Sequence, residues 1–316
     1  MILLALAAGF FLGWNIGANA AGICIAPTFG SGIMGYRRAI IIAAVFMLLG
    51  ALLNGSQVMD TVGKGIITSE VGAGTVLISL TVAGVFLLLA TLCSLPVSTA
   101  QVMIGAITGI GLAMSIKMDH GKLMHIIGSW VICPPLTMML SFLIYIGLAA
   151  VFGRIKNQQK AYLYSGKLML LSSCYLAFSL GANNVGNATG FLFNLERFNK
   201  SVWVLLVIGG CSMAIGGLTF GKRVTMTVGK SITPLNIPGA LAAQFSSAFA
   251  IHVFSLLGIP VSLSQAMVGS VLGVGLVKGA RAVSKRTLAE IGVGWVATPL
   301  LSALFAFIAC KLLMRV

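Results

Sequence analysis

Long apolar runs alternate with short polar gaps along the whole chain. Runs of about 20 apolar residues, the length that spans a bilayer as a helix, begin near residues 2, 39, 73, 123, 164, 202, 237 and 287. Each run is continuously apolar, which favours helices over the alternating strands of a membrane barrel. No basic residue precedes Leu3 in the first run, so we expect a retained helix and not a cleaved signal peptide.

Composition and charge agree with a multi-pass protein of the cell membrane. Hydrophobic residues make up 59% of the chain and charged residues 8%, whereas a soluble domain carries about 25% charge. The net charge is +15, and the bases flank the apolar runs in short clusters. Such clusters are typical of loops that stay on the cytoplasmic side of the membrane, whereas nucleic-acid binding needs one continuous basic surface. We therefore expect a lipid bilayer as the surroundings and no nucleic acid as a partner.

Four short motifs occur twice, in the same order and at an almost constant spacing. Gly-Ala-Asn at 17–19 recurs at 181–183, and Pro-Val-Ser at 96–98 recurs at 260–262, both 164 residues later. The other two pairs are Thr-Val-Gly at 61–63 and 227–229, and Trp and Pro at 130 and 134 and at 295 and 299. The period is too long for a solenoid, whose repeats have roughly 20–50 residues. We predict two copies of one transmembrane unit, residues 1–152 and 163–316, joined by a basic cytoplasmic linker at 153–162.

The Gly-Ala-Asn motif is the first place at which we expect a transmembrane helix to break. It lies in NIGANAAG at 15–22 and in SLGANNVGN at 179–187. Asparagine is costly in lipid unless its amide is hydrogen-bonded, so Asn19 and Asn183 are predicted to contact a bound ion or other backbone. Tight helix packing through small residues is the alternative explanation.

The Pro-Val-Ser motif is the second expected break. Proline disfavours helix in the residue before it and is tolerated at a helix start, so a new helix is expected directly after Pro96 and Pro260. A helix start exposes free amides and the positive end of the dipole, which bind oxyanions. Two such starts, each in a re-entrant half-helix hairpin, would form an anion site at mid-membrane. The predicted anion-binding residues are Ser98, Thr99, Gln101, Ser262, Ser264 and Gln265, together with Asn19 and Asn183.

Together these motifs resemble the inorganic phosphate transporter (PiT) family. Its signature reads Gly-Ala-Asn-Asp-Val-Ala-Asn-Ala in each half, followed by Thr-Val-Gly and Pro-Val-Ser-Thr-Thr-His. The corresponding segments here are GANAAGICIAP at 17–27, DTVGKGI at 60–66 and LPVSTAQ at 95–101, then GANNVGNATG at 181–190, TVGKSIT at 227–233 and IPVSLSQ at 259–265. The resemblance spans nearly the whole chain. It implies an all-α membrane protein with two inverted repeats and a secondary permease for an inorganic oxyanion.

Two departures from the family pattern bear on the substrate and the coupling ion. The Asp that follows Gly-Ala-Asn in the family is Ala20 in one half and Asn184 in the other, and the His is Gln101 and Gln265. In sodium-coupled members those carboxylates lie at the cation sites, so the resemblance favours a proton over sodium as the coupling ion. Similar losses occur in the branch that resembles sulfate permeases, so phosphate and sulfate both stay open as the transported anion.

Four residues are candidates for coupling transport to an ion gradient: Asn184, Asn187, Asp60 and His252. Asp60 precedes Thr-Val-Gly, and its counterpart in the second copy is Met226, so any role would be asymmetric; a helix-cap carboxylate is the alternative. An ionisable residue inside the membrane is a functional candidate, and histidine titrates near neutral pH. His252 lies in an apolar run and fits this description, although a buried histidine with satisfied hydrogen bonds is the alternative.

Two other functions remain to be weighed against a permease. An anion channel would need a continuous pore with weak binding. An intramembrane enzyme is disfavoured, because the chain has no paired carboxylates, no HExxH motif and no nucleotide-binding P-loop. We expect no cofactor and no metal; assembly as a homodimer is left open.

Overall fold

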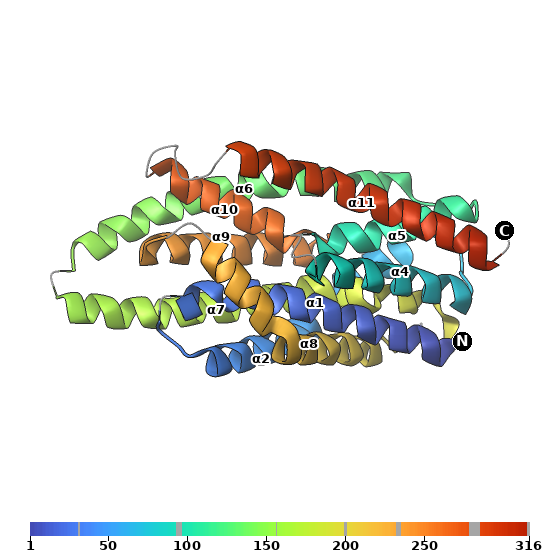
Figure 1. Cartoon of the computed structure of the whole chain (residues 1–316), viewed down its shortest axis with the longest axis horizontal. Coiled ribbons are helices and arrows are strands. Elements are labelled where there is room, and N and C mark those ends of the chain that lie inside the picture. The colour runs from blue at the N-terminus through green and yellow to red at the C-terminus, as the bar shows by residue number, and fades with distance from the viewer. Residues whose placement is uncertain are drawn as a thin grey trace.

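The computed structural model describes residues 1–30, 32–92, 97–155, 157–198, 201–231, 235–277 and 285–314. Helices make up most of this part of the chain (Figure 1). The α-helices are α1 (Ile2–Gly30), α2 (Tyr36–Asn54), α3 (Ser56–Asp60), α4 (Ala73–Leu92), α5 (Thr99–Ala113), α6 (His120–Gly153), α7 (Gln158–Thr189), α8 (Val202–Ser231), α9 (Ile237–Leu256), α10 (Leu263–Val277) and α11 (Lys285–Met314). A π-helix, η1 (Thr61–Gly65), and two 3-10 helices, η2 (Gly190–Asn194) and η3 (Glu196–Phe198), connect them.

Within the described residues, eight helices are long and apolar enough to cross a membrane. They correspond to the eight apolar runs of the sequence, which confirms the prediction of a multi-pass helical membrane protein. The additional helices α5 and α10 are apolar but have only 15 residues each. A helix of that length is shorter than the hydrocarbon core requires.

Equivalent helices of the two copies run in opposite directions. In Figure 1, α1 runs away from the end marked N, whereas α7 runs toward that end. The long helices α6 and α11 are also antiparallel. Contacts come in matched pairs, since α1 packs on α8 as α7 packs on α2, and α5 packs on α11 as α10 packs on α6. An inverted repeat produces this exchange of partners between the copies.

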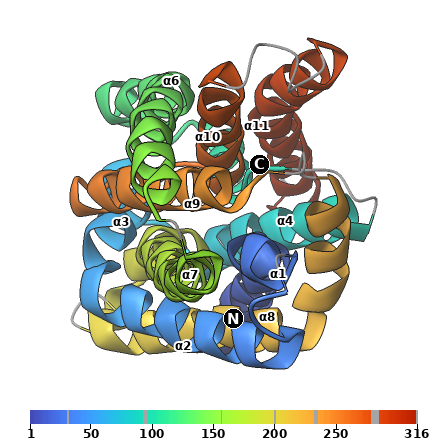
Figure 2. The same ribbon diagram turned by 90° about the vertical axis from the view of Figure 1, so that its left-hand side faces the viewer.

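The helix pairs α4 and α5, and α9 and α10, lie in opposite halves of the bundle, and the starts of α5 and α10 approach each other in the middle (Figure 1). Figure 2 looks at the bundle from the end where α6 leads into α7 and shows α7 and α1 at the centre, with α6, α10 and α11 in an outer row. Pro96 lies outside the described residues, as do the bases Lys278 and Arg281. That each hairpin enters and leaves the bilayer on one side stays a prediction.

The predicted break at Gly-Ala-Asn is wrong, because both motifs lie inside the continuous helices α1 and α7. The small residues serve close packing, which was the alternative. A Cβ atom added to Gly17 would lie 1.8 Å from the Met213 carbonyl oxygen, and one added to Gly181 would lie 1.9 Å from that of Met47. Glycine therefore lets each helix backbone touch its neighbour from the other copy.

Candidate functional site

The starts of α5 and α10 have the same capping structure. Ser98 precedes α5 with an extended backbone (φ −87°, ψ 119°), and its Oγ accepts a hydrogen bond from the Gln101 amide at 3.3 Å. Ser262 accepts from the Gln265 amide at the same distance. Serine is favoured at this position because its hydroxyl satisfies one of the free amides of the first turn. The other free amides and the positive end of the dipole remain directed beyond each helix start.

A small cavity lies where these two helix starts meet α1 and α7. Its lining residues are Asn19, Ala20 and Ile23 from α1, Val97, Ser98 and Thr99 at the start of α5, Leu180 and Asn184 from α7, and Ser262, Leu263 and Ser264 at the start of α10. Ser98 and Ser262 expose only 2% and 1% of their surfaces. The four hydroxyl residues of the predicted site therefore line one small cavity between the two copies, together with Asn19 and Asn184.

The two asparagines of the repeated motif take different places. Asn19 lines the cavity, and its Nδ2 donates to Thr91 Oγ1 at 3.2 Å. The equivalent donor, Asn183 Nδ2, reaches Ser255 Oγ at 3.0 Å, and Asn183 Oδ1 accepts from the Val261 amide at 3.1 Å. Asn183 is not among the lining residues, so it holds the segment that leads into α10 and does not face the cavity itself.

One wall of the cavity has polar contacts between α5 and α7 that the equivalent wall lacks. Thr99 Oγ1 donates to Asn184 Oδ1 at 2.7 Å, and Asn187 Nδ2 donates to the same oxygen at 3.2 Å. At the offset of 164, the equivalent residues are Leu263, Ala20 and Ile23, which are all apolar. The wall between α5 and α7 is therefore polar at these positions, whereas the wall between α10 and α1 is apolar at the equivalent positions and polar only at Asn19, Ser262 and Ser264.

Three buried carbonyl oxygens near the cavity have no hydrogen-bond partner within the described part of the chain. They are Gln101 Oε1, Gln265 Oε1 and Asn187 Oδ1. Each belongs to a residue within one helical turn of a lining residue, although Gln101 and Gln265 themselves do not line the cavity. Buried carbonyl groups are nearly always hydrogen-bonded. These three oxygens are therefore available to accept a hydrogen bond or to bind a cation that prefers oxygen ligands.

No lining residue of the cavity is ionisable. An anion held there would be stabilised by hydroxyls, amides and two helix dipoles, without a fixed positive charge. Burying a charge is costly unless hydrogen bonds compensate, so the capped helix starts are the groups that make anion binding feasible in this cavity.

The two ionisable coupling candidates lie away from the cavity lining. His252, on α9, contacts Tyr175 OH through Nδ1 at 3.1 Å and Asn54 Nδ2 through Nε2 at 3.4 Å. Asp60 is exposed at the end of α3. Partial desolvation raises the pKa of its carboxyl, and the nearby Lys64 acts in the opposite direction. Any coupling through either residue would act on the cavity from a distance.

Sequence reasoning missed the residues that support the helix starts. Trp130 Nε1, on α6, donates to the Pro260 carbonyl at 3.0 Å and so fixes the segment before Ser262. The repeated tryptophan was a signal for this role, but it also fitted simple packing. Thr91 and Ser255, which receive the asparagine amides, stand at the same offset of 164. Neither belongs to one of the four repeated motifs.

The phosphate transporter family model matches the chain twice, at residues 16–167 and 153–306. A protein from Pyrococcus furiosus that carries the name of a phosphate permease is 30% identical over 399 residues, which cover 99% of this chain and 96% of the relative. The sulfate permease CysP of Bacillus subtilis is 29% identical over 318 residues, which cover 100% of this chain and 89% of the relative.

A solved structure titled the sodium-dependent phosphate transporter has the same fold. Its TM-score is 0.90 at 24% identity, over 100% of this chain and 99% of that chain. At this identity the likeness supports the fold alone.

Proposed function

Because this chain belongs to the phosphate transporter family, we propose that it is a secondary transporter that holds one tetrahedral oxyanion between the starts of α5 and α10. Members of the family are transporters, and with its eight candidate spans the chain is a multi-pass membrane protein. The observation that carries the proposal is the pair of serine-capped helix starts, Ser98 and Ser262, on one small cavity. Helix starts of this kind bind phosphate and sulfate through backbone amides and the dipole.

Sulfate is the anion that we favour within this class. Phosphate keeps a proton near neutral pH, and a site that selects it profits from a charged acceptor for that proton. The lining residues include no carboxylate or imidazole, which suits an anion that carries no proton. The alignment with the sulfate permease spans 318 residues, close to the length of this chain, whereas the alignment with the Pyrococcus furiosus relative spans 399 because of insertions.

Proton coupling is the second part of the proposal. The residues that stand where the family has carboxylates are Ala20 and Asn184, and neither carries a negative charge to balance a sodium ion. The similar solved structure is titled sodium-dependent, so the proposal rests on this chain's own residues. Asn184 and Asn187 still offer neutral oxygens, and a proton needs no preformed cage of ligands.

Uptake into proteoliposomes tests both parts. Purified protein is reconstituted, and the uptake of labelled sulfate and labelled phosphate is followed with and without sodium and with and without an inward proton gradient. We expect sulfate uptake that the proton gradient stimulates and that proceeds without sodium, with unlabelled phosphate a weak competitor. Strict sodium dependence would overturn proton coupling, and faster phosphate than sulfate uptake would overturn the substrate preference. Uptake that depends on neither the sodium gradient nor the proton gradient would indicate an anion channel.

A further inference from the structure

A hydrogen-bonded network joins α1, α7 and α9 in the half of the bundle that contains α9. Gln244 of α9 is fully buried. Its Nε2 donates to the Cys24 carbonyl at 2.9 Å and to Ser173 Oγ at 3.1 Å, and its Oε1 accepts from Ser172 Oγ at 2.8 Å. We call Thr28, Ser172, Ser173 and Gln244 the Gln244 network.

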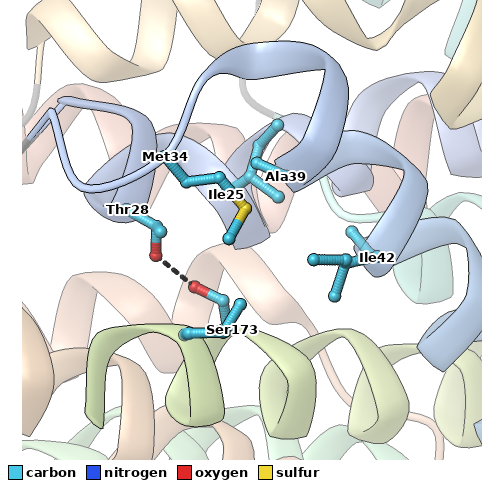
Figure 3. A pocket seen from close by; sticks show the side chains of 8 residues that line it. Ile25, Thr28, Met34, Ala39, Ile42 and Ser173 are labelled. Atoms are coloured by element: carbon cyan, nitrogen blue, oxygen red, sulfur yellow. Dashed lines mark hydrogen bonds between the residues drawn. The ribbon is translucent and has the colours of Figure 1, made fainter. Parts of the chain in front are cut away.

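Thr28 completes the network from α1. Its hydroxyl lies 2.5 Å from Ser173 Oγ, and Figure 3 shows the two side chains pointing toward each other beside a small cavity that is otherwise lined by apolar residues. All four members of the network expose 5% of their surface or less. A buried network of this size holds helices together specifically, because separating the helices without water would leave every member unsatisfied.

The four equivalent positions in the other half of the bundle carry no polar side chain. At the offset of 164, Gln244 corresponds to Leu80 and Thr28 to Leu192, while Ser172 and Ser173 correspond to Ala8 and Gly9. A Cβ atom on Gly9 would lie 2.9 Å from Leu192 Cδ1, so the contact equivalent to Ser173–Thr28 exists there as well. The two equivalent places in the bundle therefore have chemically different contacts.

Charge identifies the end on which the Gln244 network lies. The end of α1, the start of α2 and the connection between α6 and α7 lie together at that end (Figure 1), and they carry Arg37, Arg38 and Arg154. The opposite end carries the bases Lys117, Lys122 and Arg197 as well, but there they are interspersed with the acids Glu70, Asp119 and Glu196, so the end with the Gln244 network is the more basic one. By the positive-inside rule the Gln244 network faces the cytoplasm.

We propose that the Gln244 network is the cytoplasmic gate of the transport path, and that the apolar contact around Leu80 is the outer gate. When the gate opens, water and the departing anion replace the hydrogen bonds of Gln244, so that opening exchanges one set of hydrogen bonds for another. Opening the outer gate instead exposes apolar side chains, and a hydrophobic constriction resists wetting. The polar gate therefore favours release of the anion into the cytoplasm. This inference rests on the proposed transport function.

The test measures access to the central cavity from each side of the membrane. Ala20, which lines the cavity, is replaced by cysteine, and a membrane-impermeant thiol reagent is applied to inside-out and to right-side-out vesicles. Cys24 lies four residues away on the same helix, so the modification of position 20 is assigned by fragmentation of the peptide in a mass spectrometer. Gln244→Ala removes the centre of the network, Ser172→Ala removes one bond from it, and Leu80→Ala is the matched control in the other copy.

We expect Gln244→Ala to speed modification from the cytoplasmic side about ten-fold, and Ser172→Ala to speed it by a smaller factor of about two to five, since one hydrogen bond shifts an equilibrium by a few-fold. Leu80→Ala should speed modification from the outside only. If neither network variant changes cytoplasmic access, or if all three variants raise access from both sides equally, the network is a packing contact and not a gate. The readout needs no transported anion, so a wrong substrate would leave this result unaffected.

Discussion

The two copies of the repeated unit agree at the helix starts and differ on the walls around them. Ser98 and Ser262 cap α5 and α10 in the same way, at equal distances from the amides of Gln101 and Gln265. The wall between α5 and α7 is polar through Thr99 and Asn184, whereas the equivalent wall has Leu263 and Ala20. Features shared by both copies can serve a ligand on the axis between them. A contact that is present on only one of the two equivalent walls suits a task that differs between the two sides of a membrane, such as coupling or release.

The largest expected effects come from the close helix contacts that the copies share. Gly17→Ala and Gly181→Ala would each place a methyl group within 2 Å of a backbone oxygen, at Met213 and at Met47. Overpacking of this kind costs about 1–3 kcal/mol or more, and a backbone oxygen cannot move aside. Both variants should melt far below the parent in a thermal assay on detergent-purified protein.

Gly128→Ala and Gly147→Ala on α6 are the matched controls, because nothing lies within 4 Å of a Cβ atom added at either position. They should melt within a few degrees of the parent or slightly above it, since alanine favours the helix. A normal melting temperature for Gly17→Ala or Gly181→Ala would show that the helices do not pack as described.

The next effect concerns the anion. Ser98→Ala and Ser262→Ala each remove a hydroxyl from the cavity, and a hydrogen bond to a charged group contributes about 1.5–3 kcal/mol. Each variant should therefore bind the anion about 10- to 100-fold more weakly in equilibrium binding to purified protein. Ser141→Ala is the control, because it removes a buried hydroxyl that bonds to the Ser270 carbonyl and is not among the lining residues. If all three variants bind the anion with equal affinity, Ser98 and Ser262 cap their helices and do not contribute to anion binding.

The polar wall should give a smaller and one-sided effect. Asn184→Ala removes the partner of Thr99 and of Asn187, and neutral hydrogen bonds contribute about 0.5–1.5 kcal/mol each, so transport efficiency should fall about 3- to 10-fold. Ala20→Ser at the equivalent position should change it less than about two-fold, because Leu263 stands there in place of Thr99. Similar losses in both variants, measured as initial uptake rates in proteoliposomes, would contradict an asymmetric role for this wall.

Asp60 should give the smallest effect. Desolvation raises the pKa of its carboxyl in the folded protein, so the folded state holds this proton more tightly than the unfolded state does. This contribution to stability is present below the usual pKa of aspartate and is lost as the pH rises through the folded value. Asp60→Asn should remove a slight slope of melting temperature with pH in that window. If the transport rate of Asp60→Asn stays within two-fold of the parent, Asp60 has no role in coupling. If the variant loses stimulation by the proton gradient, Asp60 takes part in coupling.

The sequence was most informative where a single local rule decides the outcome. The apolar runs predict the eight spans, and the proline before Ser98 and Ser262 predicts where α5 and α10 begin. The break expected at Asn19 and Asn183 is wrong, because helix propensity and close packing outweigh the presence of Gly and Asn once the amides find partners such as Thr91 and Ser255.

The sequence could not predict contacts between the copies. Thr99 and Asn184 are 85 positions apart and come from different copies, so their hydrogen bond depends on how α5 lies against α7. Gln244 is one amide in an apolar helix, and neither its neighbours nor its counterpart Leu80 suggests a network with α1. The asymmetry of the walls becomes visible only when the offset between the copies is applied to the three-dimensional contacts.

The central claim is that the two copies build one anion site between them, and the stoichiometry of binding tests it most directly. Labelled sulfate is titrated onto the purified parent protein and onto Ser98→Ala and Ser262→Ala. We predict one bound anion per chain in the parent, and in each variant a single class of site with lower affinity. Two anions per chain in the parent, with each variant losing only one of them, would contradict it, because each copy would then hold its own anion.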